Sequence, residues 1–189
     1  MPFDLKKLRK VRSPSSEAML ARYEENLATT LPDDYREFLL SCNGGFPSYT
    51  VLNGFRASVK EFYAIEEREL FDPSRYPKFS LAIARDGSGN DYVMMLAGKV
   101  RGQIYYWDHE CEPADDFVET DDNPFPNITP AARSFREFYD RLIPNWEMIK
   151  LNGDPLPLGE VPPAWFYDPN WQIPEWAQQP GITYPNMHK

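Results

Sequence analysis

The chain has 189 residues, of which 42% are hydrophobic, and a formal net charge of −9 at pH 7. This length and composition fit one globular domain with an extension, and the negative charge argues against binding to nucleic acid. No apolar run approaches the length of a membrane span, and the amino terminus lacks the hydrophobic stretch of a signal peptide, so we expect a soluble cytoplasmic protein.

The amino-terminal segment, residues 1–14, is basic although the chain as a whole is acidic. It carries five cations: Lys6, Lys7, Arg9, Lys10 and Arg12. We interpret this segment as a tether or as an arm that forms salt bridges. The amphipathic stretch from Glu17 to Leu27 then predicts a first helix.

The segment LPDDYREFLLSCNGG, Leu31 to Gly45, predicts a second helix with defined ends. Thr30 can cap it, and a proline suits its first turn because the missing amide would have no helical partner there. Its apolar residues recur on one helical face, which we expect to be buried: Leu31, Tyr35, Phe38, Leu39 and Cys42. Asn43 and Gly44 tolerate left-handed backbone, so the helix should end there and the chain should turn into a strand.

This pattern, L-P-x-x-Y-x-x-F-L closed by N-G-G, resembles the start of the SUKH superfamily, the domain of bacterial toxin-immunity proteins and fungal regulators of cell-wall synthesis. The order of later segments fits the resemblance over roughly residues 15–143. The resemblance implies that Phe62 and Tyr63 lie in a strand and that a phenylalanine-rich helix, Ala131 to Leu142, ends the domain. It also implies a protein that acts by binding another protein.

The middle of the chain predicts an antiparallel sheet. Ser80–Ala84, Asp91–Leu96 and Val100–Trp107 are separated by short turn-forming sequences, and the last two are rich in β-branched and aromatic residues. They indicate three consecutive strands joined by tight turns. The predicted helices can cover the apolar face of this sheet, so the predicted fold class is α+β, a single domain with an antiparallel-rich sheet packed by helices.

The turn between the first two strands has the alternating oxygen ligands of a calcium loop at Asp86, Ser88 and Asn90. Such a loop needs glycine at its sixth position and glutamate at its twelfth, where this chain has Asp91 and Ala97. A glycine-rich hairpin turn is therefore the better interpretation.

Eight acidic residues, with no lysine or arginine among them, fall within fifteen positions after the third predicted strand: Asp108, Glu110, Glu112, Asp115, Asp116, Glu119, Asp121 and Asp122. Such a run can be a solvated loop. It can also be a docking surface, because an anionic patch steers a cationic partner toward it, such as a toxin that binds phosphates. We take these eight residues as the candidate partner-binding site.

The sequence offers little for catalysis or metal binding. His188 is adjacent to the carboxyl terminus, and His109 lies between two acidic residues in a segment where strand neighbours would point to opposite faces. We therefore expect no enzymatic activity, no metal and no cofactor. Cys42 and Cys111 are expected to be unpaired thiols, as is usual for a cytoplasmic protein.

The composition changes in residues 144–189, which hold nine of the nineteen prolines and four of the five tryptophans. Disordered segments are usually poor in aromatic residues, so we expect this extension to pack as a strap on the domain or on a second copy in a homodimer. Recognition of another protein is the rival interpretation. The predicted organisation is an arm at 1–14, an α+β domain at 15–143 and this extension.

The resemblance to the SUKH superfamily implies non-enzymatic binding of a protein partner. We expect an immunity protein that neutralises a polymorphic bacterial toxin, with a basic toxin domain as the partner and occlusion of its active site or substrate surface as the mechanism. The alternative is a regulatory or scaffold domain that binds a host enzyme or assembly factor.

Overall fold

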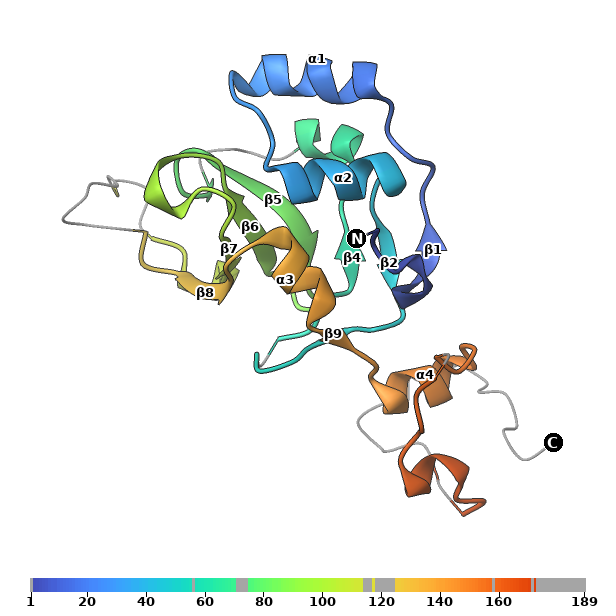
Figure 1. Cartoon of the computed structure of the whole chain (residues 1–189). Helices are drawn as coiled ribbons and strands as arrows, with labels where there is room; N and C mark the ends of the chain where they lie inside the picture. The colour runs from blue at the N-terminus through green and yellow to red at the C-terminus, as the bar shows by residue number, and fades with distance from the viewer. Residues whose placement is uncertain are drawn as a thin grey trace. The chain divides into compact units, whose positions relative to one another are not determined.

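The structure is a computed structural model that describes residues 2–55, 57–70, 75–113, 117, 125–157, 159–170 and 172. The chain divides into two units, Met1–Ile143 and Pro144–Lys189, which are described separately here (Figure 1). The first unit is an α+β fold, as predicted, in which helices pack on a large antiparallel sheet.

The strands of the first unit are β1 (Leu8–Val11), β2 (Gly45–Pro47), β3 (Val51–Leu52), β4 (Glu61–Phe62), β5 (Ser80–Arg85), β6 (Asp91–Met95), β7 (Ile104–Trp107), β8 (Ile128–Ala132) and β9 (Leu142–Ile143). Its α-helices are α1 (Glu17–Leu27), α2 (Asp33–Ser41) and α3 (Phe135–Asp140). Short 3-10 helices form at η1 (Leu5–Lys7), η2 (Ile65–Leu70), η4 (Gly98–Val100) and η5 (His109–Cys111).

The main sheet has seven strands in the order β1-β2-β4-β5-β6-β7-β8, and all neighbours are antiparallel. The predicted run of three consecutive strands is confirmed as β5, β6 and β7. The third of them begins at Ile104 rather than at Val100, because Gly98–Val100 forms a 3-10 turn and Gly102 has a positive φ of 85°. Strands β3 and β9 pair separately.

The predicted helix from Ala131 to Leu142 was wrong in its extent. Ala131 and Ala132 belong to β8, where pairing with β7 overrides the helical preference of alanine. The helix itself is α3, which begins after Ser134, whose Oγ accepts a hydrogen bond from the amide of Glu137 at 3.1 Å. Leu142 lies beyond the helix in β9.

Helix α2 confirms the predicted buried face, because Leu31, Tyr35, Phe38, Leu39 and Cys42 are all buried. The predicted cap by Thr30 was wrong. Pro32 occupies the N-cap position without a side-chain hydrogen bond, and the Oγ1 and backbone O of Thr30 instead accept hydrogen bonds from Arg101. The helix therefore begins at Asp33.

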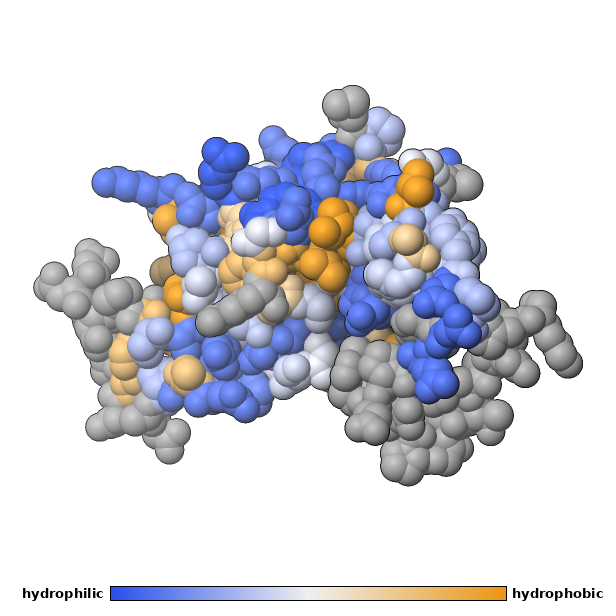
Figure 2. Space-filling model, turned by 90° about the horizontal axis from the view of Figure 1, so that it is seen from below, coloured by the Kyte–Doolittle hydropathy of each residue, from blue (hydrophilic) through white to orange (hydrophobic). Residues whose placement is uncertain are grey.

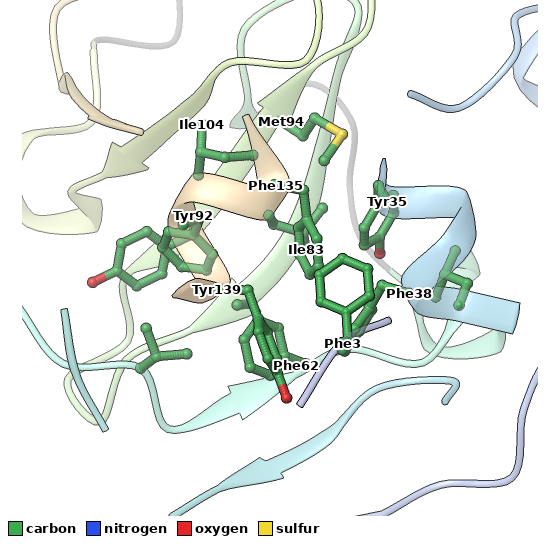
Figure 3. Packing of buried hydrophobic residues seen from close by; sticks show 14 of the residues in the cluster. Phe3, Tyr35, Phe38, Phe62, Ile83, Tyr92, Met94, Ile104, Phe135 and Tyr139 are labelled. Carbon is green, nitrogen blue, oxygen red and sulfur yellow. The ribbon is translucent and has the colours of Figure 1, made fainter. Parts of the chain in front are cut away.

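Aromatic rings dominate the main core, which lies between the sheet and helices α2 and α3 (Figure 3). The ring of Phe135 lies 4.8 Å from that of Phe38 and 4.7 Å from that of Tyr35, centroid to centroid. Phe3, from the amino-terminal segment, lies edge-on to Tyr139 at 5.1 Å. Aromatic pairs of this kind stabilise a core beyond the effect of buried area alone.

The opposite face of the sheet carries a second, smaller core of Tyr63, Tyr76, Ala82, Val93, Trp107 and Phe125. Val93 points to this face and its neighbours Tyr92 and Met94 to the main core, as the two-residue period of a strand requires. The buried carboxylate of Asp91 accepts hydrogen bonds of 2.6 Å from the hydroxyls of both Tyr63 and Tyr76. The connection between β4 and β5 is thus fixed to this face.

The basic amino-terminal segment takes part in the first unit. Its residues Leu8–Val11 form β1, and the ammonium of Lys7 donates to the backbone oxygens of Tyr139, Asp140 and Leu142 at the end of α3. A cation at this position satisfies carbonyls that the helix leaves free.

The second unit contains α4 (Trp146–Asn152) and the 3-10 helix η6 (Ala164–Tyr167). The ammonium of Lys150 donates to the backbone oxygens of Trp165 and Phe166, and the ring of Trp146 meets that of Phe166 edge-on at 5.8 Å. Part of the aromatic composition therefore packs within this unit. Trp171, Trp176 and Tyr184 lie outside the described residues.

Candidate functional site

Three of the eight predicted partner-binding residues lie in the described part of the chain: Asp108, Glu110 and Glu112. They occupy the segment Asp108–Glu112, here called the acidic turn, which follows β7. Asp115, Asp116, Glu119, Asp121 and Asp122 lie outside the described residues.

The acidic turn has a fixed backbone. Asp108 caps η5 by accepting a 3.0 Å hydrogen bond from the amide of Glu110. The amide of Asp108 donates to the backbone O of Asn127, and the side-chain amide of Asn127 donates back to the backbone O of Asp108 at 2.7 Å. Because the preceding residue, Trp107, is also buried in the second core, the start of this short segment is anchored.

The charges of the acidic turn are not equivalent. Glu112 forms an ion pair with Arg75, whose Nε lies 3.1 Å from Oε1, and this hydrogen bond raises the pKa of Arg75. The guanidinium of Arg75 also lies over the ring of Trp107. Among the described residues, Asp108 and Glu110 have no cationic partner.

His109 is held by Asn90 and belongs to the 3-10 turn that follows the end of β7. Its backbone amide and its Nδ1 both approach Oδ1 of Asn90, at 3.0 and 2.7 Å. Since an amide oxygen only accepts hydrogen bonds, Nδ1 must carry a proton. Within the described residues, no group of three or more His, Cys, Asp or Glu side chains is arranged to hold a metal ion.

The hairpin turn between β5 and β6 supports this arrangement. Asp86 accepts hydrogen bonds from the amides of Ser88 and Asn90 on Oδ1, and from the Asn90 side chain and the Tyr106 hydroxyl on Oδ2. Burial alone would raise the pKa of Asp86, but these hydrogen bonds outweigh it and lower the pKa. The carboxylate of Asp86, which the calcium-loop alternative would make a ligand, closes the turn instead, as the hairpin interpretation predicted.

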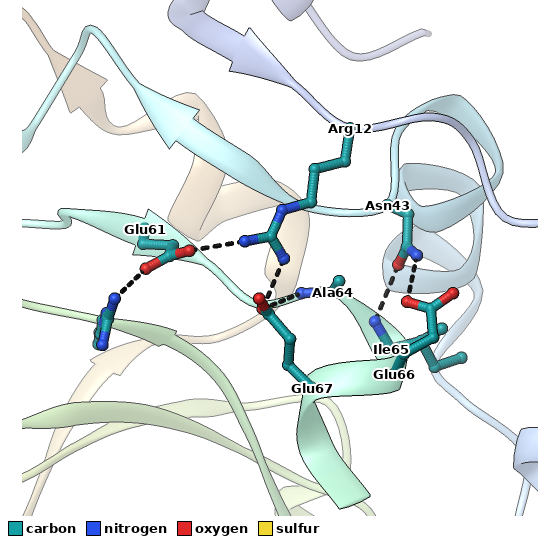
Figure 4. Close-up of polar contacts among 8 residues, drawn as sticks. Arg12, Asn43, Glu61, Ala64, Ile65, Glu66 and Glu67 are labelled. Carbon is teal, nitrogen blue, oxygen red and sulfur yellow. Dashed lines mark hydrogen bonds and ion pairs between the residues drawn. The ribbon is translucent and has the colours of Figure 1, made fainter. Parts of the chain in front are cut away.

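The signature residues Asn43, Gly44 and Gly45 serve the fold (Figure 4). The side chain of Asn43 accepts from the amide of Ile65 at 2.9 Å and donates to Glu66 at 2.7 Å. A Cβ atom on Gly44 would lie 2.5 Å from the backbone O of Phe62, and one on Gly45 would lie 2.2 Å from that of Lys10. The signature therefore joins α2 to neighbouring strands at distances that only glycine permits.

A charged network lies beside the signature (Figure 4). The guanidinium of Arg12 bridges Glu61 at 2.7 Å and Glu67 at 2.5 Å, and Arg85 pairs with the other oxygen of Glu61. Burial opposes ionisation of Glu67, but its hydrogen bonds to Arg12 and to the amide of Ala64 lower its pKa. This network fixes the basic segment to β4 and η2, and its charges are satisfied internally.

One hollow of about 280 Å³ lies on the surface between α1 and η2. It is lined by Met19, Arg22, Tyr23, Asn26, Ile65 and Glu66. Its volume is slightly below the range typical of small-molecule sites. More generally, hydrophilic residues cover most of the described surface seen in Figure 2, with hydrophobic residues in small patches.

The sheet, the helices packed on one of its faces and the N-G-G turn define a protein of the SUKH type. The family model of the SMI1/KNR4 family (SUKH-1) matches residues 14–141, and the chain belongs to this family. No curated protein matches the chain. Among the described residues, every helix is too short or too polar to cross a lipid bilayer.

Proposed function

We propose that this chain is a non-enzymatic immunity protein of the cytoplasm that neutralises a toxin by binding its basic domain. The observation that carries the proposal is the acidic turn, in which Asp108 and Glu110 lack a cationic partner among the described residues while hydrogen bonds hold the backbone at Asp108. Membership in the SUKH-1 family supports a binding role.

The rigidity of the acidic turn favours recognition. A surface that is already ordered loses little conformational entropy when a partner binds. Its negative charge, which is part of the net charge of −9, would attract a cationic partner over a distance of about one Debye length, roughly 8 Å at physiological salt. The remaining acidic residues, Asp115, Asp116, Glu119, Asp121 and Asp122, would extend the same surface.

Neutralisation by this route requires no chemistry from the immunity protein. A toxin that acts on nucleic acid must present cations to phosphates, and a protein seated on those cations excludes the substrate. Occlusion of the active site or of the substrate surface is thus the proposed mechanism.

The second candidate is a regulatory or scaffold domain that binds a host enzyme or assembly factor. Membership in the SUKH-1 family is equally compatible with this alternative. Both functions use a protein partner, and the identity of that partner separates them.

Affinity capture from the native host, with the tagged full-length chain and mass spectrometry of the retained proteins, tests the proposal. Recovery of a protein with a toxic carboxyl-terminal module is the expected result. Recovery of housekeeping enzymes or regulatory factors alone would favour the second candidate and contradict the first.

The role of the acidic turn is tested by Glu110→Lys, with Glu25→Lys on α1 as a control that changes the net charge equally. Both side chains are exposed. With the captured partner, Glu110→Lys should slow association by about tenfold at low salt and weaken its salt dependence, whereas Glu25→Lys should have a smaller effect. Equal rates for the two variants would remove the acidic turn from the binding surface.

The carboxyl-terminal extension remains a separate proposal. We propose that residues 144–189 pack on the domain or on a second copy of the chain, which would give a homodimer. Light scattering of the purified chain measures its mass and so tests the dimer directly: a monomeric mass would exclude packing on a second copy.

A further inference from the structure

Two residues other than glycine have a positive φ in the described structure, Ala28 at 52° and Phe79 at 55°. Ala28 ends α1, where its amide donates to the carbonyl oxygens of Glu24 and Glu25, so the left-handed conformation has a structural role. Phe79 has no such role at a helix end. It is the third residue of a turn that is closed by a hydrogen bond from the amide of Ser80 to the backbone O of Pro77.

The third position of a turn with positive φ favours glycine or asparagine, and an aromatic residue is strained there. The conformation of Phe79 is nevertheless well fixed. Its backbone O accepts a 2.7 Å hydrogen bond from the amide of Leu96, and the hydroxyl of Ser80 donates to Pro77 at 2.7 Å. The fold thus holds an aromatic side chain at a position that favours glycine or asparagine.

The side chain of Phe79 is also exposed, at 74% of its full accessible area. It lies beside the end of the β6–β7 hairpin, whose turn contains Val100, exposed at 36%. An apolar side chain left in water contributes nothing to folding, so the strain at Phe79 has no compensation in the stability of the isolated chain.

The charged residues in the two segments that meet beside Phe79 are all positive. We name the hairpin tip as the residues Phe79, Lys99, Val100 and Arg101. The two segments that form it, residues 75–85 and 92–103, contain no aspartate or glutamate, although the chain carries a net charge of −9. The tip lies beyond the Met94–Ile104 pair of the hairpin, and the acidic turn follows the Asp91–Trp107 pair at the other end.

We propose that the hairpin tip is a second protein-binding surface, which takes a segment that combines an apolar anchor with carboxylates. Phe79 and Val100 contact the apolar anchor, and the cations of the tip pair with the carboxylates. Exposed aromatic residues ringed by charged groups are typical of the few positions that dominate binding energy in protein interfaces. This surface is distinct from the acidic turn. If one of the two binding proposals is refuted, the other still stands.

A phage-displayed library of random dodecapeptides, selected on the immobilised full-length chain, tests this proposal without a known partner. Affinities of the selected peptides are then measured by calorimetry for the wild type and three variants. Phe79→Gly removes the aromatic ring, Lys99→Glu reverses an exposed charge, and Ala28→Gly is the matched control that relieves the same backbone strain away from the tip. All three should fold, since glycine suits both positive φ positions and Lys99 is exposed.

We expect selected peptides to be enriched in aspartate or glutamate next to an aromatic or aliphatic residue. Their affinity should fall by about tenfold or more for Phe79→Gly and by a smaller factor for Lys99→Glu, and it should be unchanged for Ala28→Gly. Phe79→Gly should melt no lower than the wild type, as expected for a residue kept for binding and not for folding. The proposal is overturned if no peptide is recovered, if the peptides lack an acidic bias, or if they bind Phe79→Gly as well as the wild type.

Discussion

The close approach of the backbone at Gly44 makes a sharp prediction about stability. A Cβ atom there would lie 2.5 Å from the O of Phe62 and 2.7 Å from the O of Tyr63, and both are backbone atoms that cannot rotate away. Gly98 is a matched control, because it also has a positive φ, 69° against 81°, but a Cβ there would meet nothing within 4 Å.

The two alanine substitutions therefore separate conformational strain from steric overlap. Gly98→Ala carries only the cost of a left-handed alanine, about 1–2 kcal/mol of unfolding free energy. Gly44→Ala carries the same cost and adds overpacking against two carbonyls, about 1–3 kcal/mol more, for a total of about 2–5 kcal/mol. For a chain of this length, each 1 kcal/mol lowers the melting temperature by about 2–4 °C.

Urea denaturation followed by tryptophan fluorescence measures both free energies. The structure requires Gly44→Ala to be the less stable variant by at least about 1 kcal/mol. Equal losses in the two variants would mean that the signature glycines serve only to permit positive φ, and that the proposed contact between α2 and β4 is wrong.

Three further predictions concern two buried carboxylates and the extension. Asp86→Asn should lower the unfolding free energy by about 1–3 kcal/mol at pH 7, because the asparagine amide cannot accept from Asn90 and Tyr106. Folding lowers the pKa of Asp86, so the ionised carboxylate stabilises the fold above the unfolded pKa of about 3.9. This stabilisation is lost as pH falls through the folded pKa. The stability difference between the wild type and Asp86→Asn should therefore shrink below about pH 4. Burial raises the pKa of Asp91 despite its two tyrosine donors, so ionisation of this carboxyl destabilises the fold. The unfolding free energy of Asp91→Asn should therefore rise relative to that of the wild type as pH increases above about 4. Parallel pH profiles of the two variants would refute both assignments. Truncation after Ile143, which keeps the β3–β9 pair, should lower the melting temperature if residues 144–189 form a strap, and an unchanged, monodisperse product would assign them to partner recognition.

Local chemistry explains the elements that the sequence predicted well. Glu17–Leu27 is helical over the predicted range, and the apolar face of α2 and the turn at Asn43 and Gly44 follow from side-chain period and glycine conformation. The hairpin turn at Asp86 was also predictable, because aspartate, serine and asparagine satisfy backbone amides within a few residues.

Long-range contacts explain the errors. Residues 8–11 become β1 only because β2 lies beside them, and Ala131 is drawn into β8 by β7. Thr30 is diverted from its expected cap by Arg101, which is distant in sequence. None of these contacts leaves a periodic signal in the segment itself, so local pattern could not reveal them.

The candidate site was predictable in its charge and not in its geometry. The run of acidic residues is visible in the sequence, but the pairing of Glu112 with Arg75 joins residues from two separate loops. The sequence did not predict a role for Phe79, because neither its positive φ nor its exposure leaves a pattern in the sequence. The signal that could have drawn attention to it is the lack of acidic residues around it in an acidic chain.

The central claim is that this SUKH-1 protein acts by binding and neutralising a protein partner. The most direct test titrates the purified full-length chain into the captured partner and measures the partner's own toxic activity. The account predicts a complete loss of activity at a fixed stoichiometric ratio, without any change in covalent structure. A partner that remains fully active when saturated with the chain would contradict it.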